Sequence, residues 1–321
     1  MTSFPYRPWL HRMAISTACV AMVTVVFGAL TTTKDAGMAF PHWLYSDAHP
    51  MPLYPWLQDF GKNWNKFLEH GHRLAGMLIG MWTIALVVLT HRMDQRTWVK
   101  RLSLLILLGV ICQGILGGFR VELNNRGLAM IHGAFAAFVF SLMGTHAVVT
   151  SKQWFAAAES KGTPVSYLKP WAVLVVVALT VQYLLGGMIR HHGTGLHEHL
   201  GMGLLSFLLI WANAIVVQRS RQSWLRWSAW LLALMTTIQV LLGAGAWVLK
   251  YGFAPMAIVP VMNSLEQILM RTVHTVFGIL VFMTAVVHLV RVWRLASFLK
   301  SEAVPFTLRT EAEPQLAGGV L

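Results

Sequence analysis

The stretch KFLEHGHRLAGMLIGMW, residues 66–82, places four polar side chains directly before an apolar run. These side chains are Glu69, His70, His72 and Arg73, and the apolar run extends beyond the quoted stretch. A helix needs roughly 17–25 residues, most of them apolar, to cross the hydrocarbon core of a membrane. The stretch therefore predicts a membrane-spanning helix with ionisable groups gathered in its first turns.

The composition indicates the same class of protein. Of the 321 residues, 56% are hydrophobic and 12% are charged, and this charged share is about half that of a soluble protein. Eight segments are long and apolar enough to span a membrane, which predicts an all-α polytopic protein embedded in the lipid bilayer. The predicted spans are 13–31, 72–90, 102–119, 128–149, 171–189, 196–217, 227–249 and 272–290.

The distribution of basic residues predicts the orientation of the spans. Of the 25 Lys and Arg residues, 16 lie in the segments that share a side with both termini. The positive-inside rule therefore places both termini in the cytoplasm, and it explains the net charge of +13 without nucleic-acid binding. On the other side, the first loop, residues 32–71, is rich in Pro and Trp and is expected to form an ordered cap.

The chain repeats itself, which predicts two pseudo-repeated four-helix bundles over residues 1–150 and 151–321. The odd-numbered spans end in similar phrases, for which we expect close helix packing through small residues. These phrases are TVVFGA at 24–29, QGILGG at 113–118, QYLLGG at 182–187 and QVLLGA at 239–244.

Each even-numbered span opens with a histidine, and a small residue follows four positions later. The four histidines are His72, His132, His199 and His274. Residues i and i+4 share a helix face, so each helix offers an imidazole with space one turn deeper, which suits a flat macrocycle. Neutral imidazole is a common metal ligand, and ionisable groups inside a membrane bundle mark functional sites. We therefore predict two hemes, one between His72 and His132 and one between His199 and His274.

A second pairing scheme uses two deeper histidines. His146 and His288 each follow a candidate ligand by 14 residues, which is roughly 21 Å along a helix. A quinol cytochrome with stacked hemes would pair His132 with His274 and His146 with His288. That scheme leaves His72 and His199 without a role, so we favour the pairing of His72 with His132 and of His199 with His274.

These features together resemble the heme A synthase family, whose members convert heme O to heme A. The resemblance covers about residues 13–293 and includes the two halves, the four histidines, EHGHR at 69–73 and TTTKDAGMAFPHW at 31–43. It implies successive oxidation of a ring methyl group to a formyl group. It also implies that the C-terminal half holds a resident heme b on His199 and His274. The N-terminal half would then bind the heme O substrate at His72 and His132.

The resemblance gives the polar cluster a role. Glu69 and His72 lie three residues apart on one helix face, and Glu69 is expected to transfer a proton or to stabilise a cationic intermediate. The structural alternative is a first-turn carboxylate that favours the helix N-terminus. Arg73 and Arg271 are expected to pair heme propionates or to anchor the interface. Several family members carry a cysteine pair in the first outer loop, whereas residues 32–71 contain none, which excludes a thiol-based step there.

The resemblance also implies a location and partners. We expect a bacterial inner (plasma) membrane protein with its heme sites near the outer face. Heme O synthase would supply the substrate, and a terminal oxidase would use the product. The alternative is a non-catalytic di-heme cytochrome b subunit that transfers electrons with a quinone, and a heme transporter is a weaker third possibility. The oligomeric state, including a homo-oligomer, stays open.

Overall fold

The computed structural model describes residues 5–157 and 165–302. In this part of the chain eight helices are long and apolar enough to cross a membrane, which confirms the all-α polytopic class. They are α1 (Pro8–Thr33), α2 (Trp64–Met93), α3 (Thr97–Glu122), α4 (Arg126–Val149), α6 (Leu168–His192), α7 (Leu196–Gln218), α8 (Ser223–Tyr251) and α9 (Leu265–Glu302). Residues 303–321 of the expected second half lie outside the described residues, as do Lys161 and Arg309 of the charge count.

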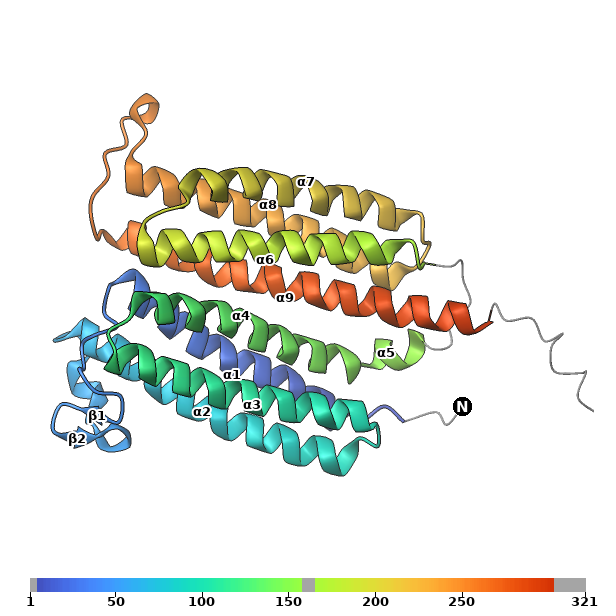
Figure 1. Ribbon diagram of the computed structural model, residues 1–321, viewed down its shortest axis with the longest axis horizontal. Helices are drawn as coiled ribbons and strands as arrows, with labels where there is room; N and C mark the ends of the chain where they lie inside the picture. The colour runs from blue at the N-terminus through green and yellow to red at the C-terminus, as the bar shows by residue number, and fades with distance from the viewer. Residues whose placement is uncertain (1–4, 158–164, 303–321) are drawn as a thin grey trace, which may run out of the picture.

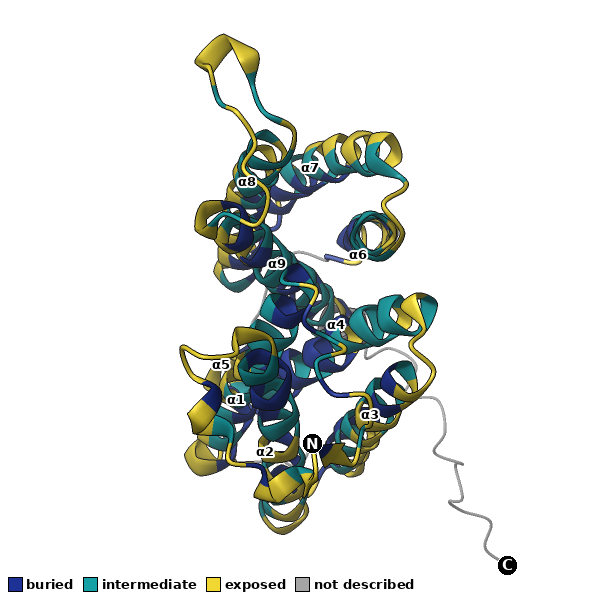
Figure 2. Cartoon of the chain, turned by 90° about the vertical axis from the view of Figure 1, so that its left-hand side faces the viewer, coloured by how far each residue is buried: buried dark blue, intermediate teal, exposed yellow. Residues whose placement is uncertain are grey.

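The helices form two neighbouring groups of four (Figure 1). Helices α1 to α4 pack against one another, and so do α6 to α9. The two groups meet where α4 packs on α9 and α6, and where α1 packs on α9. In Figure 2 α4, α6 and α9 lie in the middle of the molecule. The contact between the halves is therefore made by a few helices.

The helix α2 begins eight residues before the predicted span, at Trp64. Polar residues interrupt its first turns, so hydropathy alone does not include them. The side chain of Asn63 accepts a hydrogen bond from the backbone N–H of Lys66 and fixes the start of the helix. Glu69 and His72 therefore lie on one regular helix, and the connection from α1 ends at Asn63, whereas the predicted loop extends to residue 71.

Short elements fill the connections. The strands β1 (Tyr45–Ser46) and β2 (His49–Pro50) pair antiparallel in the α1–α2 connection, followed by the 3₁₀ turns η1 (Met51–Leu53) and η2 (Trp56–Asp59). The helix α5 (Lys152–Ala156) precedes α6, and η4 (Ala254–Met256) lies between α8 and α9. The α1–α2 and α8–α9 connections lie at the same end of the molecule (Figure 1).

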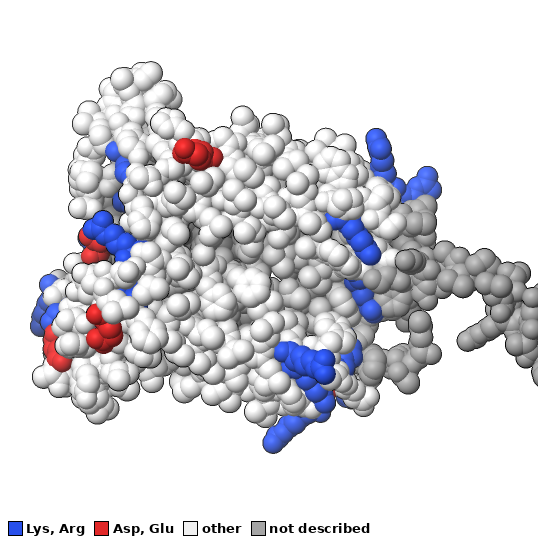
Figure 3. All heavy atoms as spheres, in the orientation of Figure 1, with Lys and Arg blue, Asp and Glu red and all other residues white. Residues whose placement is uncertain are grey.

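The surface suits a lipid environment. Large apolar side chains along the helices face outward, among them Leu108, Leu204 and Leu241. Figure 3 shows a broad uncharged middle between two charged ends. Lys and Arg are visible together with Asp and Glu at the end of the long connections, whereas the opposite end shows almost only Lys and Arg. Buried apolar residues form one cluster mainly on α1 to α4 and another mainly on α6 to α9. Ile279 of α9 belongs to the first cluster, and a third cluster joins Val99, Val148 and Val149 to Val287 of α9, so the two cores are continuous across α9.

Candidate functional site

Each of the four predicted ligands packs on a glycine of the preceding helix. A methyl group at Gly28 would lie 2.8 Å from Cε1 of His72, too close for a real contact. The equivalent distances are 3.2 Å for Gly117 and His132, 3.2 Å for Gly186 and His199, and 3.0 Å for Gly243 and His274. The glycines of the repeated phrase thus make room for an imidazole, in addition to the helix packing that the sequence predicts.

The structure brings the four histidines together as two pairs. The ring centroids of His72 and His132 are 6.2 Å apart, with planes at 87°. Those of His199 and His274 are 6.4 Å apart, with planes at 82°. A metal atom bound by two imidazole nitrogens at about 2 Å each separates the ring centroids by roughly 6 Å. Both pairs therefore have the spacing of a metal site with two histidine ligands.

The deeper histidines have other partners. Nε2 of His146 lies 3.2 Å from the Thr90 hydroxyl. Nδ1 of His288 lies 2.7 Å from the Ser228 hydroxyl, and its Nε2 lies 3.2 Å from the Asn213 amide. Both rings are buried and hydrogen-bonded within their own half of the molecule. The geometry thus favours the scheme that pairs His72 with His132 over the stacked alternative.

One hydrogen bond fixes the protonation of a candidate ligand. Nδ1 of His72 lies 3.0 Å from the carbonyl oxygen of Thr24, the first residue of the repeated phrase. A carbonyl accepts only, so Nδ1 carries the proton and Nε2 is left with a lone pair for a metal. At the equivalent positions, the amides of Gln113 and Gln239 donate to the backbone carbonyls of the following helix at 3.0 Å.

The small residues one turn deeper differ between the halves. No atom lies within 4 Å of a methyl group placed at Gly76 in α2. In the C-terminal half the Gln182 amide nitrogen would lie 3.1 Å from a methyl group at Gly203, and it is 3.3 Å from Nε2 of His199. The N-terminal pair therefore borders open space, whereas a metal at His199 requires the Gln182 amide to rotate away.

Glu69 and Arg73 bind a segment of the α1–α2 connection. This cap segment comprises residues 37–45. The Glu69 side chain is buried, and its Oε2 accepts from the backbone N–H groups of Ala39 at 2.6 Å and Phe40 at 3.2 Å. Its Oε1 forms a salt bridge of 2.5 Å with Arg73. Arg73 in turn donates to the carbonyl oxygens of His42, Trp43 and Tyr45. Glu69 and Arg73, which the sequence predicts to act at the substrate, therefore also bind the cap segment.

Helix α3 holds the same cap segment from the other side. The carboxylate of Glu122 accepts from the backbone N–H of Trp43 at 2.7 Å. The Trp43 ring packs directly on Gly118, where any side chain would collide with it. The Arg120 guanidinium packs on Gly37 in the same way. The cap segment therefore bridges the ends of α2 and α3 beside the histidine pair.

His70 lies away from His72 and belongs to the loop core. Its ring is fully buried, and its Nδ1 lies 2.9 Å from the Ser46 hydroxyl. The Tyr54 ring centroid is 4.9 Å from that of His70. Burial, together with a hydrogen bond to Asp59 and the charges of Asp59 and Asp47, raises the pKa of Tyr54 above its ordinary value. The phenol is therefore neutral and acts as a structural donor.

Two arginines at the same end of the molecule as the histidine pairs have hydrogen-bond donors that no described protein group uses. The guanidinium groups of Arg120 and Arg271 make no salt bridge or hydrogen bond within the described part of the chain. Arg271 lies one turn before His274 on α9, and both arginines are suited to bind the carboxylates of a ligand. Sequence reasoning included Arg271 but missed Arg120, whose only signal is a cation at the end of an apolar span.

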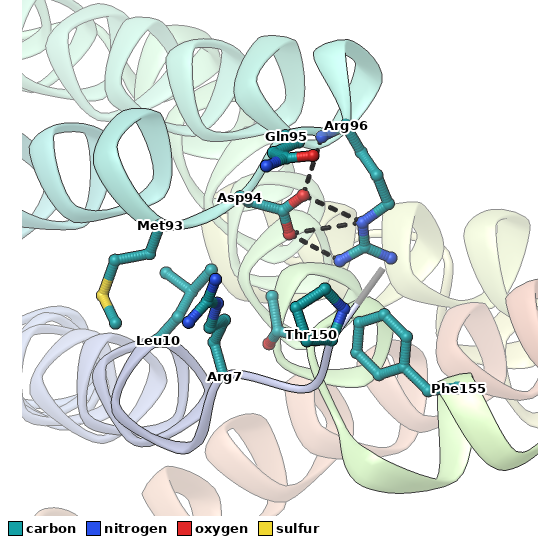
Figure 4. Close-up of a pocket in the computed structure, with 9 residues that line it drawn as sticks. Arg7, Leu10, Met93, Asp94, Gln95, Arg96, Thr150 and Phe155 are labelled. Atoms are coloured by element: carbon teal, nitrogen blue, oxygen red, sulfur yellow. Dashed lines mark hydrogen bonds and ion pairs between the residues drawn. The ribbon is translucent and has the colours of Figure 1, made fainter. Parts of the chain in front are cut away.

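The pocket in Figure 4 lies at the opposite end of the molecule. It is lined by the start of α1 and the α2–α3 connection, and Asp94 and Arg96 form a salt bridge of 2.6 Å in it. The histidine pairs lie near the first turns of α2, α4, α7 and α9, so this pocket is remote from them. We assign it no part in the candidate site.

Comparison with known proteins finds bacterial heme A synthases that are similar to part of this chain. A heme A synthase of Symbiobacterium thermophilum is 26% identical over 195 residues, which cover 58% of this chain and 61% of that protein. The chain is a relative of bacterial heme A synthases. A heme A synthase of Bacillus cereus is 29% identical over 164 residues, covering 48% of each chain. One of Bacillus mycoides is 28% identical over 148 residues, covering 41% of this chain and 42% of that protein.

These relatives confirm the resemblance that the sequence predicts. The chain spans about half the length of the relatives it matches, from 42% to 61%. No protein-family model matches the chain. The similarity to heme A synthases therefore extends over part of each protein, and the residue roles rest on the geometry described above.

Proposed function

We propose that this protein is a membrane oxidoreductase that converts heme O to heme A by oxidising a ring methyl group to a formyl group. The observation that carries the proposal is the presence of two histidine pairs, each spaced to hold one metal atom. One pair lies in each half of a chain related to heme A synthases. Two histidines at this spacing would hold the iron of a porphyrin between them.

The two pairs take different roles in this proposal. His199 and His274 would hold a resident heme b, which would supply one-electron chemistry when bound. His72 and His132 orient the heme O substrate beside the open space at Gly76. Arg120 and Arg271, which have unused donors, bind propionate carboxylates at the two sites. The chain thereby positions a substrate and a redox partner at the same end of the membrane.

Glu69 is the residue that we assign to proton transfer or charge stabilisation beside the substrate. It lies one turn before His72 on α2, and its carboxylate is held by Arg73 and by two N–H groups of the cap segment. The same contacts keep the cap segment in place and exclude water from that end of the site. Glu69 is thus a candidate catalytic residue, and it also holds the cap segment in place. Substitutions can separate these two roles.

The proposed location follows from the charge distribution. Of the 25 Lys and Arg residues, 16 lie in segments on the side of the termini, and the charged groups visible at that end in Figure 3 are almost all basic. This excess supports cytoplasmic termini and histidine pairs near the outer face of a bacterial inner membrane. Heme O synthase would supply the substrate from within the bilayer. A terminal oxidase would take up the product.

Extraction of the bound hemes tests the proposal. The protein is expressed with a source of heme O and purified, and its hemes are identified by chromatography and mass analysis. We expect heme b together with heme O or heme A. His274→Ala should lose the low-spin heme b spectrum, whereas His288→Asn on the same helix should keep it, because His288 bonds Ser228 and Asn213. Two permanent b hemes and no heme O derivative would instead support the electron-transfer cytochrome.

A further inference from the structure

One face of α6 joins the two halves of the molecule. Tyr183, Gly187 and Arg190 follow one another at intervals of four and three residues, so they share a helix face. The Tyr183 hydroxyl donates to the carbonyl oxygen of Gly133 in α4 at 3.3 Å. A methyl group at Gly187 would lie 3.1 Å from Cγ of Met130. These contacts lie on either side of His132.

Arg190 lies at the end of this face and bonds to helices of both halves. Its Nη1 donates to the Thr275 hydroxyl in α9 at 2.5 Å. Its Nη2 donates to the carbonyl oxygen of Ala29 at 2.6 Å and to the Thr33 hydroxyl at 3.2 Å, both in α1. The guanidinium thus ties α6 to α1 and α9 in one place.

The two neighbours of Arg190 adjoin the two histidine pairs. Thr275 follows the predicted ligand His274 in the chain. Ala29 follows Gly28, the glycine on which the His72 ring packs. The guanidinium therefore bonds to Thr275, which is next to a predicted ligand in the C-terminal half. It also bonds to Ala29, which is next to the glycine that contacts a predicted ligand in the N-terminal half. Among the residues that the structure describes, no other side chain bonds to both positions.

The charge of Arg190 is not neutralised by a neighbouring acid. All three of its hydrogen-bond acceptors are uncharged oxygens, and no carboxylate among residues 5–157 and 165–302 makes a salt bridge with it. A charge in a low-dielectric environment acts over a longer distance than one in water, and salt screens it less. Reduction of a heme from ferric to ferrous adds one negative charge, so a fixed cation nearby favours the reduced form.

We propose that Arg190 is the positioning residue that couples the two histidine pairs. It locks α6 against α1 and α9, and its charge raises the reduction potential of the resident heme, which favours electron transfer out of the substrate site. This inference rests on the proposed function, because it requires heme at His199 and His274. It assigns a role to a residue that the ligand pattern alone does not include.

Potentiometric titration of the resident heme tests the role of Arg190. Arg190→Gln should lower the midpoint potential relative to the wild type, and Arg190→Lys, which keeps the charge, should restore most of the difference. Tyr183→Phe removes the hydroxyl contact with α4 and keeps every charge, so it should leave the potential unchanged. Arg226→Gln, at the opposite end of the molecule, is the matched control for loss of one cation and should also leave the potential unchanged.

A wild-type midpoint potential in heme-loaded Arg190→Gln overturns the inference. If that variant does not retain heme, Thr275→Val is titrated in its place, because it removes the acceptor that holds the guanidinium beside His274. An unchanged potential in Thr275→Val is then the contrary result. A wild-type protein that binds heme b but forms no heme A refutes the proposed function and still allows every titration. A wild-type protein without heme refutes both proposals before any variant is made.

Discussion

Glu69 is held by more partners than a residue that only favours a helix N-terminus would need. Glu122 offers a comparison, because it binds the same cap segment from α3 and does not adjoin a predicted ligand. Both substitutions to glutamine remove a negative charge that accepts hydrogen bonds from the cap segment. Only Glu69 lies within one turn of His72, so only its substitution should affect the chemistry directly.

We expect Glu69→Gln to fold, to retain heme b and to bind heme O, yet to form little heme A. Loss of a group that transfers a proton lowers the rate by about 10²–10⁴-fold, and the hydroxymethyl intermediate should accumulate. Glu122→Gln should form heme A at a rate close to that of the wild type. Heme composition measured by chromatography distinguishes the two variants. Equal losses in both would show that Glu69 acts only by holding the cap segment.

The residues of the site differ in how far the sequence could predict them. The four histidines were predictable because they recur at one position of a repeated helix pair. Arg190 was not, because its partners Ala29 and Thr275 are more than 80 residues away and belong to different helices. The contacts of Arg73 were also unpredictable, since backbone carbonyls of a loop leave no pattern in the sequence.

At the scale of the element, the glycine and histidine of neighbouring helices form one unit. Gly243→Ala should push the His274 ring aside, because the new methyl group would lie 3.0 Å from Cε1. We expect loss of the resident heme with helix content unchanged, since alanine favours a helix by about 1 kcal/mol over glycine. Gly201→Ala is the control in the same half, because no atom lies within 4 Å of its methyl group. Heme absorption and circular dichroism measure both effects, and normal heme content in Gly243→Ala would contradict the assignment.

The connection between α2 and α3 contains a second unit, the salt bridge of Asp94 with Arg96. Burial alone raises the pKa of Asp94, but the hydrogen bonds and charge of Arg96 outweigh it and hold the pKa below its ordinary value. The folded-state pKa is depressed, so the stabilisation is complete above the unfolded pKa of about 3.9. It is lost as the pH falls through the folded-state pKa.

Asp94→Asn should therefore destabilise the protein at pH 7 and make little difference in strong acid. Removing one partner of a buried salt bridge costs about 3 kcal/mol. Thermal unfolding in detergent at pH 7 and at successively lower pH measures the gap between wild type and variant. The gap should narrow as the pH falls below 4, and a gap that stays constant would show that Asp94 does not contribute through its charge.

At the scale of the whole molecule, hydropathy was sufficient for the eight spans because each helix keeps its apolar side chains toward lipid as well as toward the core. It did not predict where α2 begins, since polar residues interrupt the apolar ones between Trp64 and Gly71, and the loop that packs on this segment orders it. It also did not predict that α4, α6 and α9 join the halves, because the same apolar residues serve for lipid and for helix contacts.

The orientation of the molecule in the membrane is still a prediction, and labelling of single cysteines tests it. Cys19 and Cys112 are first replaced by serine, and a cysteine is then placed at Met262 or at Ser223. Both positions are exposed, and they lie at opposite ends of α8 and its connections. If the excess of Lys and Arg sets the topology, the connection between α8 and α9 faces the outside. A membrane-impermeant maleimide should then label Met262→Cys in intact cells, and Ser223→Cys only after permeabilisation. The reverse pattern would place the histidine pairs on the cytoplasmic side, where the product would be released on the opposite face of the membrane from the one proposed.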